Sequence, residues 1–379
     1  MHIGIFTDTY APQINGVVTS TISFKKAYEA MGHKVTVFCP SVPGAKESTE
    51  DVKRFRSVTY PFQKEYRLVL PFTMSLKEVK ALNLDVIHAQ TPFTMGYMAL
   101  KYGKKLGVPV VHTYHTFFAE YIHYVPCIPV KLVKKWAHKE SRDFCNRCAH
   151  VVVPSVQMKD KLGDYGVTVP MSVVPTGVSS EDVTDEEKVA FRSDFDLLET
   201  DRVLMYVGRL AHEKNILFLA QAFARLRDQF SSLKLVLIGD GPARKDLENK
   251  IDELGIKQSV IITGYVDRHQ VFVGLDIAEL LVFPSKTETQ GLSIIEALAM
   301  GTPAVCINEM GVSDVLAQNR GGYLTEDCLD SYVEHVALLL NDSSLREIKQ
   351  KEAIQRASDF SEEALAQTMI SIYEGTLES

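Results

Sequence analysis

Short apolar runs alternate with helical patterns along this chain, and the alternation starts twice. The runs that predict strands in the first half are His2–Thr7, Lys34–Phe38, Asp85–His88, Val108–His112 and His150–Pro154. Segments with the apolar spacing of a helix, such as Val17–Met31 and Met95–Leu106, lie between them. The second half repeats the pattern, with strands at Arg202–Tyr206, Lys234–Ile238, Ser259–Thr263, Ala278–Phe283 and Thr302–Ile307. Alternation of this kind predicts parallel sheets with helices on both faces.

The restart of the pattern predicts two domains. A chain of 379 residues is long enough to form two hydrophobic cores. The stretch Pro175–Thr200 is acidic and opens with turn-forming residues, so we interpret it as the linker and entry to the second domain. The fold class is therefore α/β, with two Rossmann-like doubly wound domains, residues 1–174 and 175–359, facing a cleft. Ligands of such folds bind at the carboxyl ends of the strands.

Composition excludes several classes of protein. The 46% of hydrophobic residues and 23% of charged residues are typical of a soluble globular protein. No apolar run approaches the length of a membrane-spanning helix, and the N-terminus lacks the basic region of a signal peptide. The six cysteines are scattered, which indicates reduced thiols in a cytoplasmic protein. Cys145 and Cys148 lack the second pair that a zinc site needs, so we interpret them as helical cysteines.

The net charge of −7 is unevenly distributed. Residues 1–175 contain 22 Lys and Arg against 13 Asp and Glu, a balance of +9, and the remaining residues carry −16. A basic half attracts an anionic partner. No nucleic-acid motif is present, so we expect no nucleic acid partner and favour an anionic membrane surface. Aromatic and basic residues interleave in 53–72 and 117–136, as at a membrane interface; the alternative is that these aromatic residues belong to the core.

The segment 280–303 carries the strongest functional pattern. A strand-like run is followed by a polar loop and then by a helical pattern that stops at Gly301. Glu288 lies in the loop and Glu296 on the helix, with Gly291 at the helix N-terminus between them. Helix N-termini bind phosphate well. A phosphate there, with one carboxylate for ribose hydroxyls and one for sugar hydroxyls, suits a nucleotide sugar; the alternative is a turn with two solvated acids.

A second segment supplies cations. The apolar run that ends near Tyr206 is followed by Gly208, and Arg209 and Lys214 lie in the turn before the next helix. Two cations at the carboxyl end of a parallel strand are well placed to neutralise a diphosphate. The run 239–244 contains two glycines but lacks the lysine and spacing of a phosphate-binding loop, so it predicts a tight strand-to-helix turn.

Together these segments resemble the retaining glycosyltransferases of family 4, which have the GT-B fold. The family signature is two glutamates separated by seven residues plus an Arg and a Lys after the first strand of the C-terminal domain. Glu288, Glu296, Arg209 and Lys214 match it. The family usually has an aromatic residue or Pro before its Gly-Leu pair, whereas this chain has Gln290.

That variant is similar to the branch that glucosylates diacylglycerol in low-GC Gram-positive bacteria and mycoplasmas. The segments 3–20 and 112–124 resemble the same branch. The resemblance extends from the first residues to about residue 325.

The resemblance also implies a site. Arg209 and Lys214 would stabilise the leaving diphosphate, Glu288 would hold the sugar, and His115, just beyond a strand end, would contact the donor sugar. These four form the catalytic set. The backbone at Tyr265 would bind the nucleobase. The full substrate-binding set is Gly16, Val17, Gly208, Tyr265, Gln290, Gly291, Leu292 and Glu296.

The activity implied is transfer of a hexose, glucose, from UDP-glucose to the 3-hydroxyl of diacylglycerol with retention of configuration. We expect no cofactor and no essential metal, because Asp194 and Asp196, which have the spacing of a metal-binding pair, lie in the acidic linker. The implied location is the cytoplasm, peripheral on the inner face of the plasma membrane. In GT-B proteins the final helix, here about 360–379, crosses back onto the first domain.

Three alternatives stay open on the sequence. In the first, the enzyme transfers its sugar to a cell-envelope saccharide or a small soluble molecule. In the second, the protein binds a nucleotide sugar or a lipid surface without catalysis. Against the latter, none of the four signature residues is missing. A dinucleotide-dependent dehydrogenase would need Gly-x-Gly-x-x-Gly after an early strand, which neither Gly4 nor Gly16 supplies.

Overall fold

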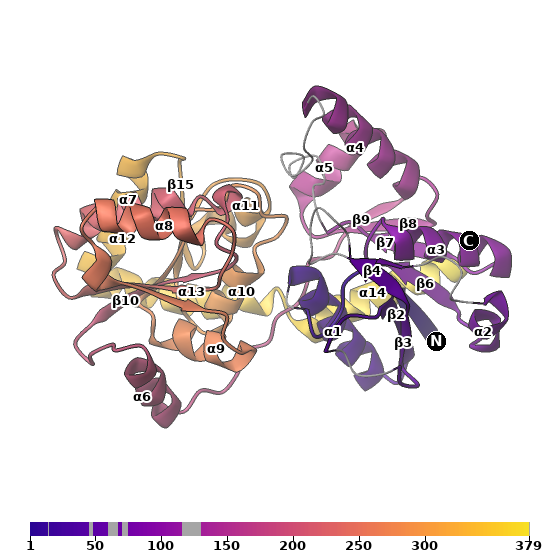
Figure 1. Cartoon of the computed structure of the whole chain (residues 1–379), viewed down its shortest axis with the longest axis horizontal. Coiled ribbons are helices and arrows are strands. Elements are labelled where there is room, and N and C mark those ends of the chain that lie inside the picture. Colours follow the sequence, from indigo (N-terminus) through magenta and orange to yellow (C-terminus); the bar gives the residue numbers. More distant parts are fainter. Residues whose placement is uncertain (14, 45–47, 60–66, 70–74, 116–129, 379) are drawn as a thin grey trace. The chain divides into compact units, whose positions relative to one another are not determined.

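The computed structural model describes residues 1–378 apart from 14, 45–47, 60–66, 70–74 and 116–129. It divides into two compact units (Figure 1). Unit 1 comprises Met1–Gly177 and Glu362–Ser379, and unit 2 comprises Val178–Ser361. The chain therefore leaves unit 1 once and returns to it with its last helix.

Unit 1 contains a parallel sheet of seven strands in its described residues, in the order β3-β2-β1-β6-β7-β8-β9. Their bounds are β1 His2–Phe6, β2 Lys34–Pro40, β3 Val52–Phe55, β6 Val86–Ala89, β7 Val110–Thr113, β8 His150–Val153 and β9 Met171–Val173. A short antiparallel pair joins β4 (Ser57–Thr59) to β5 (Arg67–Val69). The order of the strands reverses between β1 and β6, which defines the switch point of this sheet.

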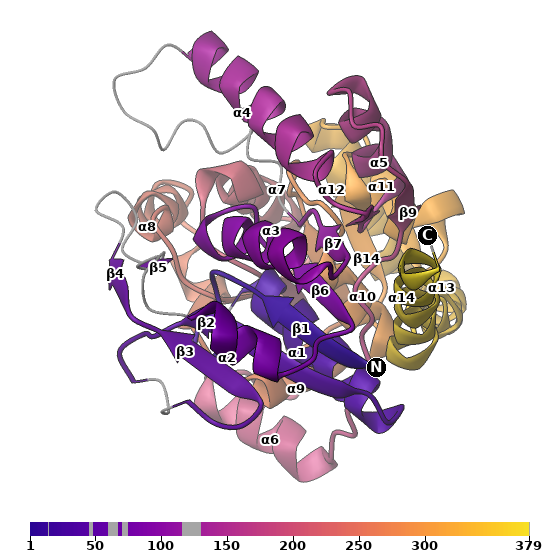
Figure 2. The ribbon, with the colours of Figure 1, turned by 90° about the vertical axis from the view of Figure 1, so that its right-hand side faces the viewer.

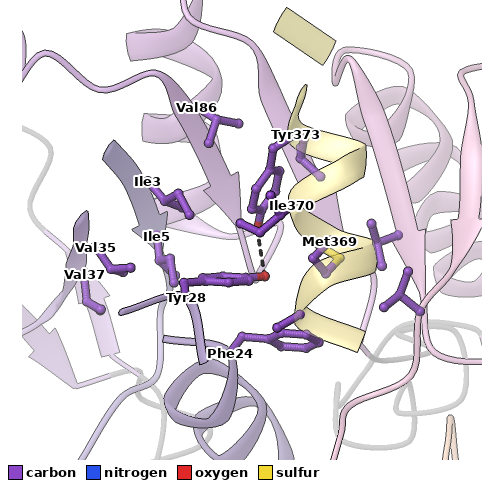
Figure 3. Close-up of a cluster of buried hydrophobic side chains, with 14 of the residues drawn as sticks. Ile3, Ile5, Phe24, Tyr28, Val35, Val37, Val86, Met369, Ile370 and Tyr373 are labelled. Carbon is purple, nitrogen blue, oxygen red and sulfur yellow. Dashed lines mark hydrogen bonds between the residues drawn. The ribbon is translucent and has the colours of Figure 1, made fainter. Parts of the chain in front are cut away.

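Helices cover both faces of this sheet. The first and last helices of the chain, α1 and α14, pack together on one face, and α3 lies over β1, β6 and β7 (Figure 2). Side chains from α1 and α14 and from β1, β2 and β6 form one buried cluster, which includes Tyr28 and Tyr373 (Figure 3). The helices are α1 Gly16–Ala30, α2 Leu76–Ala81, α3 Thr94–Leu106, α4 Val130–Cys145, α5 Val156–Asp164 and α14 Glu362–Leu377.

Unit 2 has a parallel sheet of six strands among its described residues, in the order β12-β11-β10-β13-β14-β15. The strands are β10 Arg202–Val207, β11 Leu233–Ile238, β12 Val260–Gly264, β13 Leu280–Phe283, β14 Ala304–Ile307 and β15 Gly322–Thr325. Numbered by sequence this order is three-two-one-four-five-six, the Rossmann order, with its switch point between β10 and β13.

The helices of unit 2 form two groups of neighbours. One group contains α7, α8 and α12, and α9, α10 and α13 form the other; α12 and α13 also contact each other. The bounds are α6 Asp185–Asp194, α7 Ile216–Arg227, α8 Arg244–Glu253, α9 Arg268–Ile277, α10 Leu292–Ala299, α11 Gly311–Val315, α12 Leu329–Asn341 and α13 Ser343–Ser358, with 3-10 turns η3 His212–Lys214, η4 Lys257–Ser259 and η5 Ala317–Asn319. Within the described part of the chain, no helix is both long and apolar enough to cross a bilayer.

The ten strands predicted above are all present, with ends displaced by two residues at most. Sequence analysis missed five of the described strands: β3, β9 and β15, which lie at sheet edges, and the short pair β4 and β5. The edge strand β12 was predicted. Edge strands are half-exposed and carry fewer apolar residues, so their pattern is weaker. The predicted linker 175–200 contains a helix, α6, which packs on α9. A capping box between Thr184 and Glu187 starts it, and this sequence signal was overlooked.

Candidate active site

The predicted cations and carboxylates of unit 2 follow the two strands at its switch point. Gly208, Arg209 and Lys214 come directly after β10, and the loop with Glu288 follows β13. Because β10 and β13 are parallel neighbours, their carboxyl ends lie side by side at one edge of the sheet. The fold therefore brings together two segments that are far apart in sequence.

Glycines let the backbone close up at this edge. Gly208 donates its N–H to the Ile238 carbonyl at 3.0 Å. A Cβ atom on Gly239 would lie 2.0 Å from the Gly208 carbonyl oxygen, and one on Gly241 would lie 2.4 Å from that of Leu210. Any larger residue would push these strand ends apart. The run 239–244 is thus a tight turn beside the site, as predicted.

Lys214 and Glu288 form an ion pair across the two loops. Lys214 ends the 3-10 turn η3, and Glu288 lies between β13 and α10. Their side chains are only 15% and 17% exposed, so each charge has lost much of its water and depends on the other. The Tyr206 hydroxyl, buried beneath, donates to the Arg209 carbonyl at 3.1 Å and so anchors the first loop.

The segment before α10 is held in a special backbone conformation. Gly291 has φ +90°, which favours glycine, and it is the N-cap residue of the helix that begins at Leu292. The Gly311 N–H donates to the Glu288 carbonyl at 3.0 Å, and a Cβ on Gly311 would lie 2.1 Å from the Thr289 carbonyl oxygen. The side chain of Gln290 is buried. The contacts with Gly311 and the burial of Gln290 therefore fix the backbone of the loop that carries Glu288.

Glu296 is a buried carboxylate on α10. Its oxygen lies 3.1 Å from an Arg268 guanidinium nitrogen at the start of α9. Burial raises the pKa of Glu296; the nearby charge of Arg268 opposes this rise, and the charge of Glu181 adds to it. Sequence analysis did not find Arg268, because no local pattern relates α9 to α10.

Tyr265 lies beyond β12, at the same end of the sheet. Its side chain is 63% exposed, and its hydroxyl donates to the Asp240 carbonyl at 3.2 Å. An exposed aromatic ring tied to a neighbouring strand end is a suitable floor for a flat ligand.

In unit 1 the predicted residues also follow strands at the switch point. Gly16 is the first residue of α1, and Val17 the second. The side chain of Asn15 caps this helix by accepting from the Val18 N–H at 3.0 Å. Asp8, which follows β1, binds the N-terminus of a second helix, α3. Its buried carboxylate accepts a hydrogen bond from the Met95 N–H at 3.0 Å.

His115 lies just beyond β7. Its Nε2 is 2.6 Å from Oε1 of Gln90, which follows β6. Removal of the ring from water, with a smaller contribution from His112, lowers the pKa of His115 to about 3. The imidazole is therefore neutral at physiological pH. Gln90 was missed by sequence analysis, since a single glutamine after a strand carries no signal.

Cys145 and Cys148 are buried, and burial raises the pKa of the Cys145 thiol to about 12. Among the described residues no group of three or more His, Cys, Asp or Glu could hold a metal ion.

Phe55 is buried and stacks on Phe38, so membrane contact was the wrong interpretation of this residue. Within the two proposed membrane segments, residues 60–66, 70–72 and 117–129 lie outside the described residues.

Comparison with known proteins identifies the family. Residues 14–182 match the family described as Glycosyltransferase Family 4, and residues 188–357 match Glycosyl transferases group 1. The alpha-monoglucosyldiacylglycerol synthase of Streptococcus pneumoniae is 32% identical over 334 residues, which are 86% of this chain and 75% of that protein. The protein of the same name from Acholeplasma laidlawii is 29% identical over 385 residues, covering 98% of this chain and 96% of that one.

Solved structures agree on the fold. The crystal structure of Anabaena HepE in complex with UDP and glucose matches with a TM-score of 0.78 at 16% identity, and the match covers 99% of this chain and 100% of that one. Similarity at this level of identity concerns the fold alone. Taken with the two family matches and the identity to the pneumococcal protein, it establishes that the chain belongs to glycosyltransferase family 4 and has the GT-B fold.

Proposed function

We propose that this glycosyltransferase moves glucose from UDP-glucose to the 3-hydroxyl of diacylglycerol and retains the anomeric configuration. The observation that carries the proposal is the Lys214–Glu288 ion pair at the switch point of unit 2, beside the start of α10. Cation, carboxylate and helix N-terminus together suit a sugar diphosphate. The similarity to two synthases of monoglucosyldiacylglycerol supports the acceptor.

Each residue then has a role. Arg209 and Lys214 neutralise the diphosphate as its negative charge grows, assisted by the N–H groups at Gly291 and Leu292. Glu288, released from Lys214 when the donor binds, accepts hydrogen bonds from the sugar hydroxyls. Glu296 accepts from the ribose diol.

In the reaction the bond from the anomeric carbon to the diphosphate oxygen breaks, and a bond to the acceptor oxygen forms. The acceptor oxygen attacks from the face on which the diphosphate leaves, and the hydroxyl proton passes to the departing phosphate oxygen. No protein nucleophile and no metal is required in this route.

Exposed aromatic and basic side chains on α4 support a membrane-facing role for unit 1. Trp136 is 63% exposed, and Lys135 and Lys139 on the same helix are also exposed. Amphipathic aromatic rings flanked by cations favour the interface of an anionic bilayer. Together with the charge of +9 over residues 1–175, they point to peripheral attachment at the inner leaflet.

The decisive assay incubates the purified chain with UDP-glucose and mixed micelles of diacylglycerol and an anionic phospholipid. Free UDP and lipid-linked glucose are both followed, and GDP-mannose serves as the control donor. We expect glucosyl-diacylglycerol with the α configuration. Release of UDP without glycolipid would exclude the lipid acceptor and favour a soluble or cell-envelope acceptor. Binding of UDP without turnover would favour the non-catalytic alternative.

Glu296 offers a test that separates binding from stability. The folded protein raises the pKa of Glu296 above that of an unfolded glutamate, which is about 4. Stability is therefore lost as the pH rises from that value through the folded pKa, because the carboxylate then ionises in a buried place. We therefore expect Glu296→Gln to melt at the same or a higher temperature at pH 7, since Arg268 is 44% exposed and stays solvated. The same variant should bind UDP-glucose about 10- to 100-fold more weakly, because a charged hydrogen-bond acceptor is lost. Calorimetric titration and thermal melting measure the two effects, and unchanged affinity would contradict the ribose role.

A further inference from the structure

Behind His115 lies a buried chain of polar side chains that the reaction above does not use. The hydroxyl of Tyr28 on α1 is 3.1 Å from that of Tyr373 on α14 (Figure 3). The Tyr373 hydroxyl is in turn 2.6 Å from Nδ1 of His88 on β6, and His88 Nε2 is 2.7 Å from the hydroxyl of Thr113 on β7. All four side chains are buried, so water cannot replace these contacts without opening the core.

Gln90 connects this chain to His115. Its amide nitrogen lies 3.2 Å from His88 Nδ1 and 3.4 Å from His88 Nε2, while its carbonyl oxygen lies 2.6 Å from His115 Nε2. Burial, with the neighbouring rings of His115 and His112, holds the pKa of His88 well below its ordinary value. The two His88 nitrogens are engaged by the hydroxyls of Tyr373 and Thr113, and the amide nitrogen of Gln90 lies beside this ring. The amide oxygen of Gln90 is directed at His115.

This orientation determines the proton on His115. A carbonyl oxygen can only accept, so the contact of 2.6 Å requires the N–H of His115 to be on Nε2. A neutral imidazole has one N–H and one lone pair. The lone pair is therefore on Nδ1, which can only accept a hydrogen bond.

We propose that Gln90 is a positioning residue that fixes His115 in the Nε2–H tautomer, so that Nδ1 accepts a hydrogen bond from a hydroxyl of the donor sugar. Gln90 lies between His115 and His88, and His88 in turn contacts Tyr373. The last helix of the chain thus reaches the candidate active site through three hydrogen-bonded side chains. The contact with a sugar rests on the proposed function, whereas the tautomer does not.

The tautomer is measurable on the full chain with 15N-labelled histidine. Long-range proton–nitrogen correlation spectra distinguish the two neutral forms and the charged form, and the His115→Gln spectrum assigns the signals. We expect a single neutral Nε2–H form of His115 between about pH 5 and 8. A neutral Nδ1–H form, or a charged ring in that range, would overturn the proposal whether or not the chain transfers sugar.

Two substitutions of Gln90 test its effect on the reaction. Gln90→Leu keeps the size and removes both polar contacts. We expect kcat to fall by about 10- to 100-fold, because the ring loses its orientation. The KM for UDP-glucose should change by less than about threefold, since Arg209, Lys214 and Glu296, which are proposed to bind the UDP part of the donor, are unchanged.

Gln90→Glu keeps an acceptor but adds a negative charge, which raises the pKa of His115. The other titratable groups that face this region, His112 on β7, His88 on β6 and Tyr373 on α14, carry no negative charge at neutral pH. Below the raised pKa, Nδ1 is protonated and cannot accept. The activity of Gln90→Glu should therefore fall as the pH is lowered and recover as it is raised, and its His115 spectrum should titrate in step.

Tyr373→Phe is the matched variant at the far end of the chain of contacts. It keeps the ring in the core and removes only the hydroxyl that touches His88, so we expect a smaller fall in kcat, of about three- to tenfold. Wild-type kcat in Gln90→Leu, or a pH profile of Gln90→Glu identical to wild type, overturns the positioning role. If the wild-type chain transfers no sugar, the proposed function fails, and the spectra alone decide the tautomer.

Discussion

Replacing Lys214 by methionine is expected to lower kcat with UDP-glucose by about 100- to 1000-fold, the effect of removing one group that stabilises a developing negative charge. Methionine keeps the length and apolar stem of lysine and removes only the cation. Steady-state kinetics with the micellar diacylglycerol assay measures the loss. Lys250→Met is the control, because Lys250 also forms an ion pair, with Glu253 at 2.9 Å, but lies on α8 and has no proposed role.

Stability could confound this result, because Lys214→Met leaves Glu288 without its partner in a half-buried place. The double variant Lys214→Met with Glu288→Gln removes both charges and restores the balance. We expect the double variant to melt close to the wild type and still to lack activity, since its site holds neither the cation nor the carboxylate. A double variant that regains more than a tenth of wild-type kcat would show that the single variant had failed through misfolding, and the assignment of the pair to the site would be wrong.

Replacing Ile370 by alanine is expected to destabilise unit 1 by about 2 to 5 kcal/mol, the usual effect of truncating a buried aliphatic side chain. Ile370 is 2% exposed on α14, where it packs in the cluster that includes Tyr28 and strands β1 and β2 (Figure 3). Denaturant unfolding measures the free-energy change. Ser371→Ala is the control, because Ser371 is exposed on the same helix and its hydroxyl bonds only to the Gln367 carbonyl of that helix among the contacts described.

Deleting the whole of α14, by ending the chain after Ser361, tests the same packing on a larger scale. Without α14 the apolar face of β1, β2 and β6 loses part of its cover, so we expect a poorly soluble protein that no longer unfolds cooperatively. A truncated chain with wild-type stability would contradict the view that the last helix completes the core of unit 1.

Local sequence was a good guide wherever an element is buried on both faces. The central strands, such as β1 and β10, are almost entirely buried and mostly apolar, so their short apolar runs can be recognised without knowledge of their neighbours. The edge strands β3 and β9 are largely only partly buried, so their apolar pattern is weaker, whereas the edge strand β12 keeps enough apolar residues to be predicted. The acidic composition of 175–200 favours a linker, but the capping box of Thr184 and Glu187 in the same stretch predicts the start of α6.

Local sequence is enough to predict the two α/β units and the family. It also places Glu288, Glu296, Arg209 and Lys214 after strand ends or on a helix. Which of these side chains are in contact depends on how the elements pack. Lys214 pairs with Glu288 because β10 and β13 are neighbours, and Glu296 pairs with Arg268 because α9 packs on α10. His115 meets Gln90, and α14 meets His88, across even larger separations in sequence. Such contacts follow from strand order and helix packing, which the free energy of the whole core selects and which no local pattern encodes.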